Sequence, residues 1–352
     1  MRKFLFAGAA LFVLGVASAA EYTVTDLGTL DGTFSDARAI NNRGLVVGAA
    51  DSPSEFGIRA VLYEGGTLRD IGTLGGPGSE AWGVNSRGQI VGWANLPDES
   101  EWPGVERPFL YSGGTMIDLG TLGGSYGRGN DINARGQVVG VAATADDSEE
   151  RAFLYWKGQM LDLGTLGGSF SIADAINESG DVVGSAYTVD DAEVHAFLYV
   201  DGAMVDLGTL GGWASDATDI NNRGQVVGWS YLEDGITYHA FLYEHGSMTD
   251  LHSLGTNSVA RGINSTGAVV GYFTVGPSND PESRAFVYMD GVMTDLNELI
   301  DPTTGWSLTA AEGINNCGEI VGYGHIDGYG HGFLLTPVRR REGCSEDDGT
   351  TD

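Results

Sequence analysis

One phrase of about 44 residues recurs seven times along this 352-residue chain. Its most regular part reads Asp-Leu-Gly-Thr-Leu-Gly-Gly, and versions of it begin at Asp26, Asp70, Asp118, Asp162, Asp206, Asp250 and Asp295. A fixed period of this length indicates a repeat architecture, in which each copy is one structural unit. Residues shared by all copies then build the scaffold, and function is expected where one copy departs from the others.

Each copy divides into four short runs with the character of β-strands. In the fourth copy we expect strands at residues 171–176, 181–186, 195–200 and 204–210. The first two are joined by a turn from Asn177 to Gly180, where Asn accepts backbone hydrogen bonds and Gly takes the left-handed conformation. The pair Val182-Val183 is typical of a strand. No stretch has a helical period of useful length.

Four antiparallel strands per repeat predict a propeller blade, and an open β-solenoid is the alternative. The two chain ends decide between them. Residues 22–30 form a lone fourth strand at the N-terminus, and the chain finishes after a third strand at 332–336. Pairing these two strands would complete the last blade and remove the exposed sheet edge. The sequence therefore predicts an all-β, seven-bladed β-propeller, closed by the N-terminal strand joining the last blade.

The sequence of the repeat resembles that of the HAF-repeat family of exported bacterial proteins. The tripeptide stands as His195-Ala196-Phe197 and His239-Ala240-Phe241, and its variants begin at Arg59, Arg107, Arg151, Arg284 and His331. The segments 299–306 and 334–337 also look like that family's C-terminal unit. The resemblance spans the mature chain and implies an exported repeat protein, with no catalytic residues to carry over.

The chain ends predict export. Residues 1–20 form a signal peptide, with basic Arg2 and Lys3, an apolar run from 4 to 16 and small residues at 17–20. Residues 21–338 form the seven-repeat propeller, and 339–352 form a polar, disordered tail. No later apolar run approaches the length of a membrane span. We expect a secreted, extracellular monomer without membrane insertion, with the periplasm as the other destination.

The net charge of −30 argues against nucleic-acid partners and anionic membranes. Acidic residues gather in the loops between second and third strands, for example at 146–150 and 190–193. Such carboxylates suit calcium, which would be the protein's one cofactor, but they equally serve solubility. The two cysteines, Cys317 and Cys344, predict a disulfide that pins the tail to the last repeat.

The position three before the turn Asn changes chemistry in every copy. It reads Arg38, Trp82, Asn130, Asp174, Thr218, Arg261 and Glu312. The first strand of a blade lies nearest the axis, so this mixed ring suits a specific polar ligand. Alternatively, these residues satisfy one another across a narrow channel.

The seventh copy departs most, with a short glycine-rich segment from Gly324 to His331. It holds His325 and Tyr329, which we predict to join the ligand site as metal or acid–base groups. The Arg or His before each third strand is instead interchangeable between copies. It is expected to make one repeated structural hydrogen bond, with the Asp of Asp-Leu-Gly as the natural partner.

These features predict a non-catalytic binding scaffold of the HAF-repeat type. Its partner would be an extracellular glycan, a cation or a surface protein. The rival hypothesis is a carbohydrate-active enzyme, a polysaccharide lyase or hydrolase, with its site on the face of variable loops. Arg38 and Arg261 would then neutralise carboxylates, while His325, Tyr329 and His331 acted as acid and base. The rival requires these groups to line one pocket.

Overall fold

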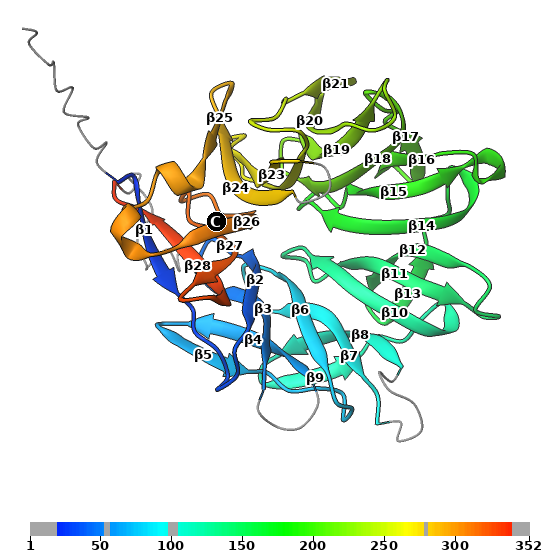
Figure 1. Cartoon of the computed structure of the whole chain (residues 1–352). Coiled ribbons are helices and arrows are strands. Elements are labelled where there is room, and N and C mark those ends of the chain that lie inside the picture. The colour runs from blue at the N-terminus through cyan, green and yellow to red at the C-terminus, as the bar shows by residue number, and fades with distance from the viewer. Residues whose placement is uncertain (1–19, 53–56, 98–104, 278–280, 340–352) are drawn as a thin grey trace, which may run out of the picture.

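The computed structural model describes residues 20–52, 57–97, 105–277 and 281–339. These residues form seven four-stranded antiparallel blades around a central axis (Figure 1). The predicted signal peptide and tail lie almost wholly outside the described residues, as does Cys344, so the Cys317–Cys344 disulfide stays a prediction. Within the described ranges, no helix combines the length and apolar character that a bilayer crossing needs.

The blades follow one another along the chain, each running from the axis outward. Blade one is β2 (Ser35–Ile40), β3 (Val46–Asp51), β4 (Ile58–Glu64) and β5 (Thr67–Asp70). Blade two is β6 (Ser79–Val84), β7 (Ile90–Asn95), β8 (Glu106–Ser112) and β9 (Thr115–Asp118). Blade three is β10 (Gly123–Ile132), β11 (Val138–Thr144), β12 (Glu150–Trp156) and β13 (Gln159–Asp162). Blade four is β14 (Gly167–Ile176), β15 (Val182–Thr188), β16 (Val194–Val200) and β17 (Ala203–Asp206), with the 3-10 turn η1 (Val189–Asp191).

The remaining blades repeat this order. Blade five is β18 (Gly211–Ile220), β19 (Val226–Leu232), β20 (Tyr238–Glu244) and β21 (Ser247–Asp250). Blade six is β22 (Ser258–Ile263), β23 (Val269–Val275), β24 (Glu282–Met289) and β25 (Val292–Asp295). The turns η2 (Leu296–Glu298) and η3 (Pro302–Thr304) lead to blade seven, which is β26 (Ser307–Ile314), β27 (Ile320–Ile326), β28 (Tyr329–Pro337) and β1 (Tyr22–Asp26).

The predicted closure is confirmed. Strand β1 pairs antiparallel with β28, with Tyr22 opposite Pro337 and Asp26 opposite Phe333. The outer strands are shorter than predicted. Strand β1, for example, ends at Asp26 rather than at residue 30. The Asp26 carboxylate accepts the Gly28 N–H at 2.8 Å and turns the chain there. Asp206 makes the same turn with Gly208, so Gly211 begins β18 instead of closing the preceding strand.

A ring of asparagines ties each blade to the next. The turn Asn in each β-hairpin next to the axis donates its side-chain N–H to the backbone carbonyl of the equivalent Asn one blade on. Five of these bonds run from Asn41, Asn85, Asn133, Asn221 and Asn264, at 2.9–3.1 Å. Asn177 bonds Asn221 at 3.5 Å, and Asn315 closes the circle on Asn41 at 3.2 Å.

The hydrophobic core lies between the blades. The Phe of the repeated tripeptide is fully buried in six copies, at Phe109, Phe153, Phe197, Phe241, Phe286 and Phe333. The clusters cross blade boundaries: Val139 and Ala152 of blade three pack with Ala173 and Phe197 of blade four. A blade therefore buries its apolar faces only when both neighbours are present.

Removing residues 21–31 should leave the outer edge of β28 unpaired and take Tyr22 out of the core of blade seven. We expect the truncated chain to lose a large share of the roughly 5–15 kcal/mol that stabilises a typical domain. Denaturant unfolding of this truncation against a chain lacking only residues 1–20 measures the loss. Equal midpoints for the two chains would show that β1 does not close the ring.

Candidate functional site

All seven residues of the predicted axial ring sit at β-bulges of the innermost strands. In blade one, for example, Ala37 faces Gly48 and Ala39 faces Val47, which leaves Arg38 unpaired between them. The same register shift leaves one extra residue in the other six innermost strands: Trp82, Asn130, Asp174, Thr218, Arg261 and Glu312. A bulge re-aims the side chain of its extra residue. The variable position that the sequence singled out is therefore also the one that the backbone geometry marks.

The glycine of the Val-Val-Gly phrase makes this bulge sterically acceptable. At Gly48, a Cβ would overlap the carbonyl oxygen of Asp36 on the neighbouring strand. Gly184 and Gly228 meet the carbonyls of Ile172 and Asp216 in the same way. Only glycine allows the two backbones this approach.

A second set of axial groups lies two residues before the bulge, on the same face of the innermost strands. Here the carboxylate of Asp36 accepts the Nε–H of Arg38 at 2.8 Å, and that of Glu80 accepts the indole N–H of Trp82 at 2.9 Å. Burial raises the pKa of Asp36 to about 6, although Arg38 beside it pulls the other way. Sequence analysis missed this set, although alternation along a strand places residues i and i−2 on one face.

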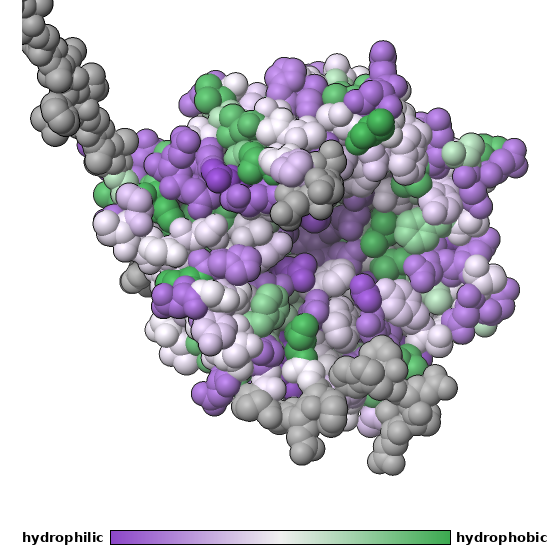
Figure 2. Space-filling model, in the orientation of Figure 1, coloured by the Kyte–Doolittle hydropathy of each residue, from purple (hydrophilic) through white to green (hydrophobic). Residues whose placement is uncertain are grey.

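Two arginines and one tryptophan stack beside the axis. The guanidinium groups of Arg38 and Arg128 lie 6.0 and 5.5 Å from the ring centre of Trp82. Arg128 also lies 5.3 Å from the ring of Tyr126 and forms an ion pair with Glu106 at 2.6 Å. The side chain of Arg38 is 39% exposed, so the stack is reachable from solvent. Figure 2 shows a hollow at the centre of the visible face, with hydrophilic residues on its floor.

Blades five to seven give the opposite side of the axis a different character. Arg261 forms an ion pair with Glu312 at 3.6 Å, and its guanidinium lies 5.6 Å from the ring of Tyr272. Trp229 and Tyr323 occupy the position of Tyr272 in the blades on either side, and each of the three lies opposite the residue two before the bulge. Three successive blades therefore carry half-buried aromatic rings at this level, and the rings of Tyr272 and Tyr323 lie near the Arg261–Glu312 pair.

Buried polar atoms lie near the aromatic wall, which consists of Trp229, Tyr272 and Tyr323 with the rings that extend from them. Burial raises the pKa of Asp174, and the nearby charge of Asp216 raises it further. Burial also raises the pKa of Asp216, so the two carboxyl groups favour one shared proton over two negative charges. The side-chain oxygen of Asn130 and the Nε of Arg261 make no hydrogen bond to any described residue. Such groups are available to a bound ligand or water.

Two ring members have structural partners. Asn130 donates to the carbonyl of Ala173 at 2.9 Å, and Thr218 donates to the carbonyl of Ala260 at 2.9 Å. Each bond reaches a backbone carbonyl of the next blade rather than another member of the ring. The mixed ring thus divides into members that join blades and members that present charge or an aromatic face.

The predicted seventh-blade loop is a β-hairpin. Strand β27 continues to Ile326 and β28 begins at Tyr329, so only Asp327 and Gly328 form the turn, both in the left-handed conformation. His325 is exposed and contacts Thr309 at 3.3 Å. The side chain of Tyr329 is exposed at the hairpin's tip.

The groups required by the enzyme hypothesis do not contact one another. No hydrogen bond, ion pair or ring contact among the described residues joins His325 or Tyr329 to Arg38 or Arg261. His331 instead pairs with Asp26 of β1 at 2.9 Å.

The repeated Arg or His has the structural partner expected for it in most blades. His195 bonds Asp206 at 2.9 Å, His239 bonds Asp250 at 3.0 Å, and Arg284 reaches Asp295 at 3.4 Å. Arg59 pairs with Asp70 at 4.0 Å. Arg107 and Arg151 differ, since they contact Thr121 and Glu149.

Several carboxylates of the acidic loops between second and third strands also have backbone partners. Asp147 accepts the N–H of Ser125, and Asp191 accepts that of Ser169 at 2.7 Å. Asp234 accepts the N–H groups of Ile236 and Thr237 within its own loop. These oxygens fasten the loops to the blades, which is a role the loop composition alone did not reveal.

No protein-family model and no curated protein matches the sequence. Solved structures match it through the fold. The β-propeller domain of the Trilobed protease from Pyrococcus furiosus has a TM-score of 0.55 at 9% identity, over 88% of this chain and 97% of that one. YCF48 bound to D1 peptide has 0.53 at 12%, over 95% and 98%. TolB from Acinetobacter baumannii has 0.45 at 10%, and the match covers 90% of this chain but 66% of TolB. The architecture is that of a β-propeller, and the HAF resemblance stays a prediction.

Replacing His195 by Ala should remove a repeated scaffold bond and lower the free energy of unfolding by about 1–2 kcal/mol. Replacing His195 by Arg, which four other blades carry at this position, should restore most of the loss. Thermal or denaturant unfolding of the two variants tests this. Equal destabilisation by both would mean that the imidazole has a role of its own.

Proposed function

We propose that this chain is an exported, HAF-type binding protein that holds an extracellular glycan in its axial hollow. One observation carries the proposal: seven bulges at one level present six kinds of side chain, with aromatic rings beside charged pairs. A sugar offers both an apolar C–H face and a set of hydroxyl groups. Aromatic faces and fixed Arg–carboxylate pairs complement these two surfaces.

The aromatic wall extends from the axis toward the loops in blade five. Trp229 packs against Tyr231 and Tyr238 with ring centres 5.6 and 5.8 Å apart. Tyr231 in turn stacks on Trp213 at 4.7 Å, and Trp213 is 49% exposed. A line of rings of this length suits several sugar units in a row better than a single ion.

Charge narrows the class of glycan. The axial carboxylates include Glu80, Glu106 and Glu312, which outnumber the arginines once Asp36 is added, and the whole chain carries −30. Repulsion disfavours polyuronates and other anionic polymers. A neutral saccharide is therefore the expected ligand, and a surface protein or a peptide is the competing one.

A glycan-array screen of the mature chain, with and without calcium, tests the proposal. For the best neutral saccharide, calorimetry should show at least a tenfold loss of affinity for Trp82→Ala and for Arg261→Ala. Trp156→Ala and Arg69→Ala are the matched controls, because both residues are exposed and lie in the outer strands β12 and β5 of their blades. We expect these controls to bind like the parent chain.

An array without hits, or affinity that the axial substitutions leave unchanged, would overturn the proposal. Binding confined to the calcium-loaded protein would move the site to the acidic loops. Turnover of a bound saccharide would revive the enzyme hypothesis with a different set of residues.

A further inference from the structure

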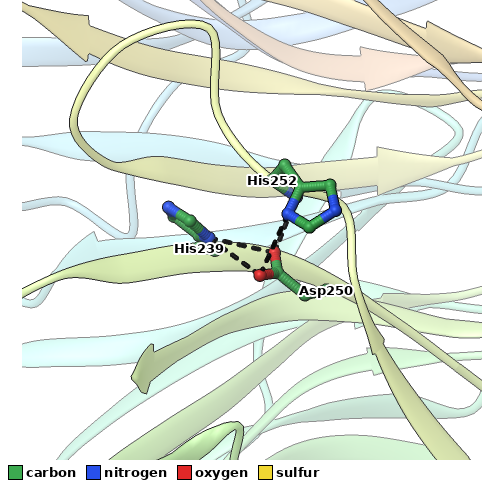
Figure 3. Close-up of side chains that lie close together, drawn as sticks. All are labelled: His239, Asp250 and His252. Atoms are coloured by element: carbon green, nitrogen blue, oxygen red, sulfur yellow. Dashed lines mark hydrogen bonds and ion pairs between the residues drawn. The ribbon is translucent and has the colours of Figure 1, made fainter. Parts of the chain in front are cut away.

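Blade five carries two imidazoles and one carboxylate in contact, away from the axial ring. His239 lies in β20, Asp250 ends β21, and His252 follows two residues later (Figure 3). The His239 Nδ1 lies 3.0 Å from Asp250 Oδ1, and the His252 Nδ1 lies 3.2 Å from Asp250 Oδ2. Both rings turn a nitrogen toward the same carboxylate. Among the described residues, this is the only group of three whose ligand atoms lie within 4.8 Å of one another.

Comparison with the other blades isolates His252 as the unusual member. His195–Asp206 and His331–Asp26 form the same pair, but there the third position is Gly208 or Gly28. Glycine also fills that position after Asp70, Asp118 and Asp162. His252 adopts φ 63°, a left-handed conformation that glycine takes without cost and a residue with a Cβ does not. The scaffold therefore does not require His252.

The geometry points to a site for a divalent transition-metal ion, with Zn²⁺ as the natural occupant. We propose that His239, Asp250 and His252 supply three ligands and leave one position open to solvent. In a tetrahedral zinc site, bond lengths of about 2.0–2.2 Å place neighbouring ligand atoms roughly 3.3 Å apart. From one carboxylate oxygen, Asp250 Oδ2, the Nδ1 atoms of His239 and His252 lie 3.0 and 3.2 Å away, which matches that edge. All three ligand atoms lie within 4.8 Å of one another, so small side-chain shifts would suffice.

The surroundings favour such an ion over calcium. Two imidazoles in a set of three suit zinc, copper or nickel, whereas calcium prefers oxygen ligands alone. The side chain of His252 is 81% exposed and that of His239 only 16%, which gives the site one fixed wall and one open side. Asp234 lies close enough to His239 to interact with it electrostatically, and the acidic surface attracts cations to this region.

Calorimetric titration of the mature chain with ZnCl₂, in excess calcium to occupy general acidic sites, tests the proposal. We expect one Zn²⁺ per chain, and at least a tenfold loss of affinity in His252→Gly. This substitution restores the residue of five other blades, so the variant should fold and unfold at the same or a higher temperature. That stability separates loss of the metal from loss of the fold.

A gain-of-site variant gives the second arm. Gly208→His places an imidazole beside the His195–Asp206 pair in the equivalent geometry, and it should add a second Zn²⁺ per chain. Equal zinc affinity in the parent chain and in His252→Gly would overturn the proposal. Displacement of the bound zinc by calcium would also overturn the proposal, because it would show that the ion binds to surface carboxylates and not to the imidazoles.

Discussion

The ring of turn asparagines around the axis is the constraint on which the rest of the structure depends. Each turn Asn fixes its own turn, as Asn221 does by accepting the N–H groups of Arg223 and Gln225, and also bonds the next blade. Next to it, half-buried Asp131 and Asp219 accept the N–H groups of Ile176 and Ile263 in their neighbours. Because these polar groups are buried or half-buried, opening any one boundary leaves them unpaired, at a cost of about 1–3 kcal/mol each. The blades therefore close together or not at all.

Without the bulges, no residue of the innermost strands would be left unpaired at this level of the axis. The extra residue in each innermost strand breaks the pairing at one level, and the glycine beside it keeps the strands close. The scaffold thus fixes where seven side chains project and leaves their chemistry free to vary. Arg38 and Trp82 can stack, while Asn130 bridges two blades, with the same backbone beneath them.

The sequence predicted the fold well because its signals were local and repeated. Turn residues, alternating strands and complementary chain ends fixed the blade count and the closure by β1. It also found the variable axial position, but not the groups around it. Arg128 meets Trp82 from another blade, and that contact depends on how far blades rotate about the axis. Glycine content suggested a loop around His325, where antiparallel pairing with Gly330 instead extends the strands. The sequence comparison did not single out His252, because it concentrated on residues shared by the repeats. The only signal for His252 is that it replaces the glycine found at this position in five other repeats.

The central claim is that repeated residues hold the fold and the bulge positions bind the ligand. Indole N–H resonances of ¹⁵N-labelled tryptophan test it directly in the intact chain during titration with the saccharide that the array selects. The account predicts that Trp82, near the axis, and Trp229, in the aromatic wall, shift on binding. Trp156, on the exposed outer side beside Lys157, should stay fixed. Shifts confined to Trp156, with the axial indoles unmoved, would contradict the account.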